Sequence, residues 1–323
     1  MRFISGCLIA FIITALALGA GGFYVAQQLQ APGPLNETKN IVIPRGSGGT
    51  AIAQKLEKEG VISSALFFKL GYVLAQHPEL KAGEYQFTPH MALPEIIDKM
   101  ARGDIVKRKF TMPEGRTSME IVQILNAEPA LSGTIIALPP EGSLMPDTYQ
   151  FTLGDDRNAK IKDMQKAMQD ALLQIWAQRD ADNPLQTPEQ LLTLASIVEK
   201  ETGVAAERPR VAGVFMNRLR KGMMLQSDPT VSYGITGGRA PLGRLLTSDD
   251  LRKPTLYNTY TIAALPPGPI ANPGKAALLA AAKPEKNDFI YFVADGSGGH
   301  AFAATLEQHN QNVAKWRKLN GNK

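Results

Sequence analysis

The stretch Thr187–Thr202, TPEQLLTLASIVEKET, joins an apolar run to two carboxylates. Thr187 before Pro188 is the pattern of an N-cap residue followed by proline at the first helical position. The run LLTLASIV that comes next predicts a helix closing over the core of a domain. The stretch therefore places Glu199 and Glu201 where a carboxylate can be buried for a chemical purpose.

The two glutamates should point in different directions, because residues two apart on an α-helix are separated by roughly 200°. We therefore expect one carboxylate to face inward and the other to be solvated. Glu201 lies over Ile197 and Val198, whereas Glu199 lies over the pair Ala195–Ser196. The more apolar surroundings favour Glu201 as the inward group, and burial would raise its pKa so that it keeps a proton to donate. A solvated surface glutamate is the alternative.

Residues 225–275 form a long stretch rich in proline, glycine, asparagine and tyrosine. Proline stiffens such a stretch, so its amide and hydroxyl groups are presented from a rigid loop beside flat aromatic rings. Sugars are bound by surfaces of this kind, where hydrogen-bonding groups converge next to aromatic faces. A polar loop with a purely structural role is the alternative that the composition leaves open.

The first 26 residues predict a transmembrane helix. After Arg2 the chain reads FISGCLIAFIITALALGAGGFYVA, and the next charged residue is Glu37. A helix that spans the hydrocarbon core of a bilayer needs roughly 20 apolar residues. Arg2 favours a cytoplasmic N-terminus with the rest of the chain outside the cytoplasm, so we expect a single-pass membrane protein. A cleaved signal peptide is the alternative, although the run exceeds the roughly 7–15 residues of a signal core.

The composition removes several classes of function. Hydrophobic residues at 44% and charged residues at 20% are ordinary for a globular protein. A net charge of +5 without a dense basic stripe predicts no nucleic-acid partner. Cys7 is the single cysteine and lies in the apolar segment, which excludes an internal disulfide and a cysteine nucleophile. The four histidines lack HxxxH or HxH spacing, so we expect no metal and no cofactor, and carboxylate chemistry remains.

Four segments follow one another along the chain. Residues 1–26 are the predicted transmembrane anchor, and residues 27–40, QQLQAPGPLNETKN, are a polar linker with two prolines. Residues 41–104 show the patterns of a strand, two helices, a second strand and a third helix, in that order, which predicts a small α+β module. Residues 105–323 predict a larger α+β domain that contains the helix described above. The fold class is therefore α+β behind an N-terminal transmembrane helix.

Several ordered motifs resemble the endolytic murein transglycosylase family, also described as YceG-like. The motifs are PEGRT (113–117), EGSLMPDTYQF (141–151), ASIVEKETGVAAERPRVAGVFMNRL (195–219), LQSDPTVSYG (225–234), YNTYTIAALPPGPIANPG (257–274) and YFVADGSGGHAF (291–302). The resemblance runs from about residue 40 to the C-terminus, and it implies that the 41–104 module is LysM-like and that 105–323 is the catalytic transglycosylase domain. Ser143 departs from the family pattern, which more often has bulky apolar side chains there, and we expect this to affect local packing.

The resemblance implies an enzyme acting inside peptidoglycan glycan strands. It would cleave the β-1,4 bond between N-acetylmuramic acid and N-acetylglucosamine, leave a 1,6-anhydro-muramyl end and so terminate elongation of a nascent strand. The catalytic acid of the family's motif falls on Glu201, in agreement with the facing argument. Ordinary glycosidases need two carboxylates. Here the nucleophile would be the sugar's own C6 hydroxyl, so one carboxyl can donate a proton and recover one.

The supporting residues are less sharply defined by the sequence. Candidates for substrate binding are Gln226, Asp228, Tyr233, Asn258 and Tyr260. Each of these can equally be a turn or core residue. His300 either lines the site or ends a β-hairpin, and the hairpin is favoured. Arg208 and Arg218 are candidate ion-pair partners of Glu199 or Glu207.

Two other functions fit parts of the same pattern. A membrane-anchored, non-catalytic peptidoglycan-binding protein would need the module and the polar loops but no buried glutamate. A scaffold for cell-wall synthases would use the transmembrane helix and the module as docking surfaces. Loss of function on replacing Glu201 would distinguish an enzyme from a binding protein. Loss of function on removing the anchor would distinguish a scaffold from both.

Overall fold

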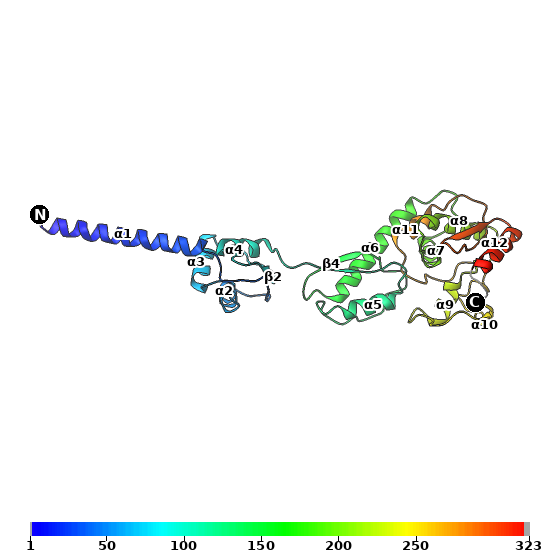
Figure 1. The fold of residues 1–323 in the computed structure, drawn as a ribbon, viewed down its shortest axis with the longest axis horizontal. Helices are drawn as coiled ribbons and strands as arrows, with labels where there is room; N and C mark the ends of the chain where they lie inside the picture. The colour runs from blue at the N-terminus through cyan, green and yellow to red at the C-terminus, as the bar shows by residue number, and fades with distance from the viewer. Residues whose placement is uncertain (1, 320–323) are drawn as a thin grey trace. The chain divides into compact units, whose positions relative to one another are not determined.

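The computed structural model describes residues 2–319, with side chains from Phe11 onward. The chain divides into two compact units (Figure 1). One extends to Arg108 and includes Phe151–Leu153, and the other comprises Lys109–Gln150 and the chain from Gly154 onward. Both units combine helices with small two-stranded sheets, so the predicted mixed α+β class is confirmed.

Helix α1 (Arg2–Gln30) carries the apolar N-terminal sequence. Its segment Phe11–Gln30 is long and apolar enough to cross a membrane, and within the described residues no other helix passes this test of length and composition. The helix continues four residues into the segment predicted as a linker, 27–40. Leu29 and Leu35 from that segment are buried in the first unit, because apolar side chains of the unit cover them.

The first unit builds its core between one sheet and three short helices. After α1 its elements are β1 (Lys39–Ile43), α2 (Gly49–Lys58), α3 (Ala65–Leu74), β2 (Gly83–Phe87) and α4 (Leu93–Arg102). Strands β1 and β2 pair antiparallel, with Lys39 opposite Phe87 and Ile43 opposite Gly83. The order strand, helix, helix, strand, helix is the one predicted for residues 41–104, while the LysM-like description stays a prediction.

The second unit is mostly helical. Its elements are β3 (Arg108–Thr111), α5 (Ser118–Ala127), β4 (Thr148–Phe151), α6 (Arg157–Ala177), α7 (Pro188–Glu201), η1 (Ala205–Glu207), α8 (Arg208–Arg220), α9 (Asp228–Thr236), α10 (Ser248–Arg252), α11 (Lys275–Ala282), β5 (Tyr291–Ala294), β6 (His300–Ala303) and α12 (Leu306–Leu319). Strand β3 pairs with β4, and β5 pairs antiparallel with β6. Helices α9 and α10 interrupt the stretch 225–275, which the composition alone had indicated to be a continuous loop.

Helix α7 lies at the centre of the second unit, packed against α6, α8, α9 and α11 (Figure 1). The hydroxyl of Thr187 accepts the backbone N–H of Gln190, and Pro188 occupies the first turn, so the predicted helix start is confirmed. Every residue from Thr193 to Val198 is buried. Ser196 within this run accepts the backbone N–H of Ile270 at 3.0 Å, which fixes the proline-rich loop to the helix.

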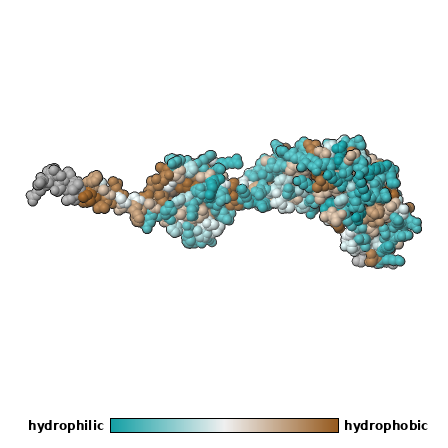
Figure 2. All heavy atoms as spheres, turned by 90° about the horizontal axis from the view of Figure 1, so that it is seen from above, coloured by the Kyte–Doolittle hydropathy of each residue, from teal (hydrophilic) through white to brown (hydrophobic). Residues whose placement is uncertain are grey.

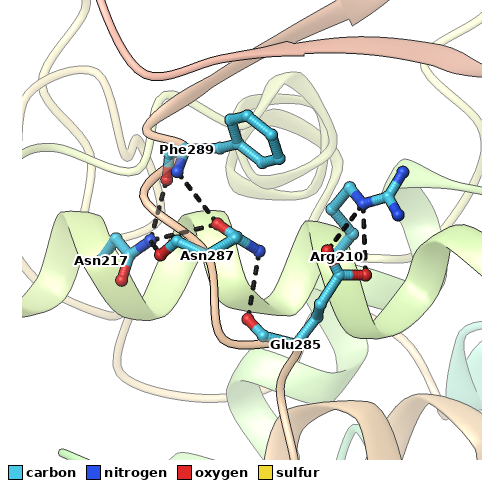
Figure 3. Close-up of polar contacts among 5 residues, drawn as sticks. All are labelled: Arg210, Asn217, Glu285, Asn287 and Phe289. Atoms are coloured by element: carbon cyan, nitrogen blue, oxygen red, sulfur yellow. Dashed lines mark hydrogen bonds and ion pairs between the residues drawn. The ribbon is translucent and has the colours of Figure 1, made fainter.

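A polar cluster fastens the lead-in to β5 onto helix α8 (Figure 3). The amide of Asn217 donates to the carbonyls of Asn287 at 2.8 Å and Phe289 at 3.0 Å. Seven residues before Asn217 on α8, about two turns away, Arg210 donates to the Glu285 carboxylate at 2.9 Å. These bonds hold the β5–β6 pair, and with it His300, against the core of the second unit.

Candidate active site

Glu201 is the last residue of α7, and its carboxyl is enclosed by protein. The Ser227 hydroxyl donates to Glu201 Oε1 at 2.5 Å. Burial is the largest influence on this group and raises its pKa to about 7; the Ser227 hydrogen bond opposes the shift, and the nearby charge of Asp228 adds to it. Glu201 retains some exposed surface. The inward orientation expected from the helix geometry is confirmed, and the carboxyl is poised to hold or release a proton near neutral pH.

Ser227 is aimed at Glu201 by a tight turn of the backbone. Gln226 adopts a left-handed conformation, with φ of 52°, that non-glycine residues seldom take. This turn leaves Gln226 and Asp228 exposed while Ser227 between them is buried. The Ser227 N–H donates to Thr259 Oγ1 at 2.9 Å, and its carbonyl accepts from Thr230 Oγ1 at 2.6 Å. The serine that holds the carboxyl is therefore itself held from both sides.

Arg218 stabilises the backbone turn at Gln226 through hydrogen bonds. Its buried guanidinium donates to the backbone carbonyls of Ile290 at 2.7 Å, Met224 at 3.1 Å and Leu225 at 2.9 Å. A further bond reaches Gln226 Oε1 at 3.2 Å. Arg218 is thus committed to backbone carbonyls, and the prediction that it pairs with Glu199 or Glu207 is wrong.

Exposed Asp228 and half-buried Tyr260 form the rim beside Glu201. The Tyr260 hydroxyl donates to Asp228 Oδ1 at 2.7 Å. Burial, followed by the contact with Asp228, raises the pKa of Tyr260, so its hydroxyl stays protonated in the working range. The negative charge of Asp228 lies close enough to Glu201 to affect its pKa. A fixed carboxylate beside a proton donor suits stabilisation of a developing positive charge.

Asn258 lies behind this rim and is fully buried. Its amide donates to the carbonyls of Leu251 at 3.0 Å and Lys253 at 2.8 Å, and its Oδ1 accepts the backbone N–H of Tyr260 at 2.9 Å. Both ends of the side chain are therefore used within the protein. The structure places Asn258 as a residue that positions Tyr260 rather than one that faces a ligand.

Tyr233 lies five residues after Asp228 on α9, about one and a half turns along the helix, and joins a second polar network. Its ring packs against Tyr257 with centroids 4.9 Å apart, and its hydroxyl is hydrogen-bonded to Glu141. Glu141 Oε1 also accepts from the backbone N–H of Ser118 at 2.8 Å and from the amide of Asn272 at 3.1 Å. Burial raises the pKa of Glu141. Tyr233 is therefore oriented by segments from three distant parts of the chain.

Glu199 corrects the expectation that the other carboxylate would be solvated. Its side chain is 5% exposed and pairs with Arg208 at 3.2 Å, so the predicted pairing with Arg208 is confirmed. Its second oxygen accepts the backbone N–H of Gly274 at 3.0 Å. Glu199 is enclosed because loops from 113–117 and 272–274 cover the side of the helix that an isolated helix would expose. Glu199 is occupied by a cation, whereas Glu201 is held by a neutral hydroxyl.

His300 lies at the start of β6 and closes the other side of the site. Its Nδ1 lies 2.8 Å from Glu207 Oε2, and its backbone N–H donates to Glu207 Oε1 at 2.9 Å. The structure thus supports both expectations for this residue: it belongs to the β5–β6 hairpin, and it is near enough to Glu201 to influence the pKa of that group.

A groove of about 720 Å³ runs over α9 and the loop that follows it. Its lining includes Lys200, Asp228, Tyr233, Leu242 and Ile270. Lys200 directly precedes Glu201, and Asp228 directly follows Ser227. The groove therefore runs beside the two residues whose side chains form the buried hydrogen bond. No cluster of three or more His, Cys, Asp or Glu side chains suited to a metal ion occurs in the part of the chain that the structure describes.

The structure brings Glu201, Asp228 and Tyr260 together and places Gln226 at their edge. Tyr233 lines the groove, whereas Asn258 is buried and does not line it. Sequence reasoning missed Ser227, although it stands between two residues that it had selected. It also missed the hydrogen-bonded pair of half-buried Glu141 and buried Asn272. The position of Ser227 between two polar candidates, directly before a helix-starting Asp-Pro, was the signal available in the sequence.

Comparisons with known proteins agree with this arrangement of motifs. The YceG-like family model matches residues 41–315. An endolytic murein transglycosylase of Bacillus subtilis is 33% identical over 86% of this chain and 85% of its own length. A protein of the same name from Streptococcus pneumoniae is 30% identical over 95% of this chain, which spans 64% of that relative.

The structural comparison gives the same family. The crystal structure of a putative yceG-like protein from Listeria monocytogenes matches 85% of this chain and 99% of its own, with 32% identity and a TM-score of 0.52.

Proposed function

The chain belongs to the YceG-like family, and we propose that it is an endolytic murein transglycosylase in which Glu201 is the single acid–base group. The relatives of that name at 30–33% identity support the class of enzyme, a peptidoglycan lytic transglycosylase. The observation that carries the assignment to Glu201 is its enclosed carboxyl, hydrogen-bonded to Ser227 and with a pKa of about 7.

In the proposed reaction the Glu201 carboxyl acts twice, first as the acid that donates a proton and then as the base that accepts one. Protonated Glu201 donates to the glycosidic oxygen as the bond from C1 of N-acetylmuramic acid to that oxygen breaks, and N-acetylglucosamine leaves with a free 4-hydroxyl. The C6 hydroxyl of the muramyl residue then bonds to C1 and returns its proton to the Glu201 carboxylate. The enzyme regains its starting state, no water is consumed, and the product ends in a 1,6-anhydro ring.

A single carboxyl suffices because the nucleophile is part of the substrate. Glu199 is unsuited to a second catalytic role, since its two oxygens are used by Arg208 and Gly274. Asp228 supplies a fixed negative charge near the reacting carbon instead, and Tyr260 holds that carboxylate in place. This division of roles resembles an acid with an electrostatic stabiliser rather than the matched acid and nucleophile of ordinary glycosidases.

The groove supports a polymer substrate that is cut internally. It extends from Asp228 past Tyr233 to Leu242 and Leu245, so sugars on one side of the cleaved bond can lie along α9. The Tyr233 ring offers an aromatic face, and exposed Gln226 offers an amide at the edge of the site. We propose that Gln226, Asp228, Tyr233 and Tyr260 contact peptidoglycan, with Asn258 acting through Tyr260.

We further propose that α1 anchors the enzyme in the inner membrane as a single span. The N-terminus would lie in the cytoplasm and the catalytic domain in the periplasm, since Arg2 precedes the apolar run. An anchored enzyme of this kind would act on glycan strands close to where they are made. It could then terminate nascent strands, in contact with cell-wall synthases.

The decisive experiment compares Glu201→Gln with the unaltered enzyme on purified sacculi. We expect release of anhydro-muropeptides, measured by liquid chromatography and mass spectrometry, to fall by about 10²-fold or more. Glutamine keeps the size of the side chain, so circular dichroism and the unfolding midpoint should report an intact fold. Release at the original rate by a folded Glu201→Gln enzyme would eliminate the proposed chemistry.

A further inference from the structure

Helix α3 in the first unit has an apolar face that the unit leaves uncovered. Leu66 is 64% exposed, Leu70 38%, Val73 53% and Leu74 69%. These positions fall within roughly 100° around the helix axis, so they form one continuous stripe. The helix sequence, ALFFKLGYVL, contains Lys69 at the edge of that stripe as its single charged residue. We call these four side chains the α3 stripe.

The α3 stripe is presented by a firmly held helix rather than a frayed one. The Ser64 hydroxyl accepts the backbone N–H of Leu66 at the start of α3. On its other side Phe68 is fully buried in the core of the unit. Gly71 is so close to Ile97 that an added Cβ would lie 3.2 Å from the Ile97 side chain. Exposure of the stripe is therefore a fixed property of the fold.

The α3 stripe continues onto the end of the membrane-spanning segment. Helix α3 packs against α1 within the first unit. The rings of Tyr24 and Phe67 meet edge to face with centroids 6.3 Å apart, and a Cβ on Gly71 would lie 3.3 Å from Leu29. Both contacts fall in the last seven residues of the Phe11–Gln30 span. In Figure 2, brown surface lies both on α1 and on the adjoining part of the first unit.

We propose that the α3 stripe is inserted in the outer interface of the membrane that α1 spans, so that the first unit rests on the bilayer through α3. The proposal rests on the anchoring role given to α1. A helix that lies in the plane of the interface buries its apolar face at the boundary between headgroups and acyl chains, and binding strengthens with the apolar area that is buried. Tyr24 marks the depth of this interface, where tyrosine is enriched. Lys69 can extend its ammonium group to the lipid headgroups.

The position of the stripe favours lipid over a second copy of this chain. Its neighbour α1 leaves the bilayer at the level of Tyr24 and Leu29, so α3 lies at the membrane surface wherever α1 is inserted. A groove of about 460 Å³ bordered by Leu29, Leu74 and Ile97 widens the apolar surface beside the stripe. An acyl chain can fill such a groove, whereas a rigid protein surface would have to match its shape.

The test uses the full chain reconstituted in vesicles of phosphatidylethanolamine and phosphatidylglycerol. A nitroxide is attached to one cysteine at a time, made as Leu66→Cys, Leu70→Cys, Val73→Cys or Leu74→Cys in a Cys7→Ser background. Val42→Cys is the matched control, because Val42 is an apolar residue of the same unit, 43% exposed on strand β1. Paramagnetic resonance then compares collisions of each label with oxygen, which enters lipid, and with a water-soluble nickel chelate.

We expect oxygen collisions to exceed nickel collisions at all four α3 positions and nickel to exceed oxygen at Val42. Nickel in excess at the four positions, in chains that float with the vesicles and digest glycan, overturns the interfacial placement and leaves the anchor and the enzyme standing. Spin–spin broadening between chains at the α3 positions would assign the stripe to a second copy. Chains that do not float with vesicles would remove both the anchor and this inference.

Discussion

The Ser227 hydroxyl donates a hydrogen bond of 2.5 Å to Glu201 Oε1, and this bond joins the end of α7 to the start of α9. Two opposing influences meet at this contact. Burial raises the pKa of Glu201, and the hydrogen bond from Ser227 lowers it. Their balance, a pKa of about 7, lets the same carboxyl be acid in one half of the reaction and base in the other.

Replacing Ser227 by alanine should raise the pKa of Glu201. The hydroxyl stabilises the charged carboxylate, so its loss should raise the pKa of Glu201 further, by roughly one unit. The alkaline limb of the kcat/KM profile on glycan strands should shift upward by the same amount, and kcat should fall because the carboxyl is less well placed. Ser248→Ala, at an exposed position of α10, is the matched control and should leave the limb unchanged. An unmoved limb in Ser227→Ala would show that the hydrogen bond does not tune Glu201.

The pH dependence of the unaltered enzyme follows from the protonation that the first step needs. Glu201 must carry a proton to donate, so kcat/KM should be highest below the pKa of about 7 and fall tenfold per unit above it. The measurement is the initial rate of anhydro-muropeptide release between pH 5 and 9, with salt held constant. Activity that keeps rising from pH 7 to 9 would be incompatible with Glu201 as the acid.

Glu201 should also make the fold less stable as the pH rises. Its pKa is raised in the folded state from an ordinary 4.5 to about 7, so the folded protein binds the proton more tightly than the unfolded chain. The destabilisation is absent below pH 4.5, grows between the two pKa values and is complete above pH 7, where it reaches about 3 kcal/mol. Urea unfolding at pH 5 and pH 8 should show Glu201→Gln gaining stability over the unaltered protein at the higher pH. An equal difference at both pH values would argue against a buried, titrating carboxyl.

Glu199→Gln should behave in the opposite way. Glu199 pairs with Arg208 and accepts the N–H of Gly274, so the neutral amide leaves a mostly buried cation with the carboxylate of Glu114, 3.7 Å away, as its remaining counter-charge. We expect a loss of roughly 1–3 kcal/mol in the free energy of unfolding, with any fall in activity following the loss of folded protein. Urea titrations of Glu199→Gln and Glu201→Gln at pH 8 give the comparison. A fully stable Glu199→Gln enzyme without activity would reassign the acid to Glu199.

Asn272→Asp should unsettle the network that orients Tyr233. The Asn272 amide donates to Glu141 Oε1 at 3.1 Å, and a second carboxylate at this distance would repel the first. We expect a loss of about 3–5 kcal/mol in the free energy of unfolding at pH 8. The loss should be smaller at pH 5, where one of the two carboxyls can keep a proton. Asn310→Asp on exposed α12 is the control for adding a charge and should change stability little at either pH.

Local patterns predicted most of the elements. The capping sequence at Thr187 and the apolar period after it located α7, and the patterns in residues 41–104 located α2, α3 and α4. Strand β4 and helices α9 and α10 were missed, since elements of four, nine and five residues in segments rich in proline and glycine carry too little periodicity to stand out. Side chains outside the element stabilise α10, since the amide of Asn258 donates to the carbonyls of Leu251 and Lys253 at its C-terminal end.

The sequence by itself favoured Glu201 over Glu199 as the inward carboxylate, because the angle between helix positions is fixed by the backbone and the residues one turn before Glu201 are apolar. It also determined that the first residues are apolar for the length of a bilayer. Only the tertiary structure decided that Glu199 is buried. It also decided the hydrogen bonds from Ser227 to Glu201 and from Asn272 to Glu141. Those contacts join segments 26 to 131 residues apart, and no periodicity along a chain encodes which distant loops will cover the same carboxylate.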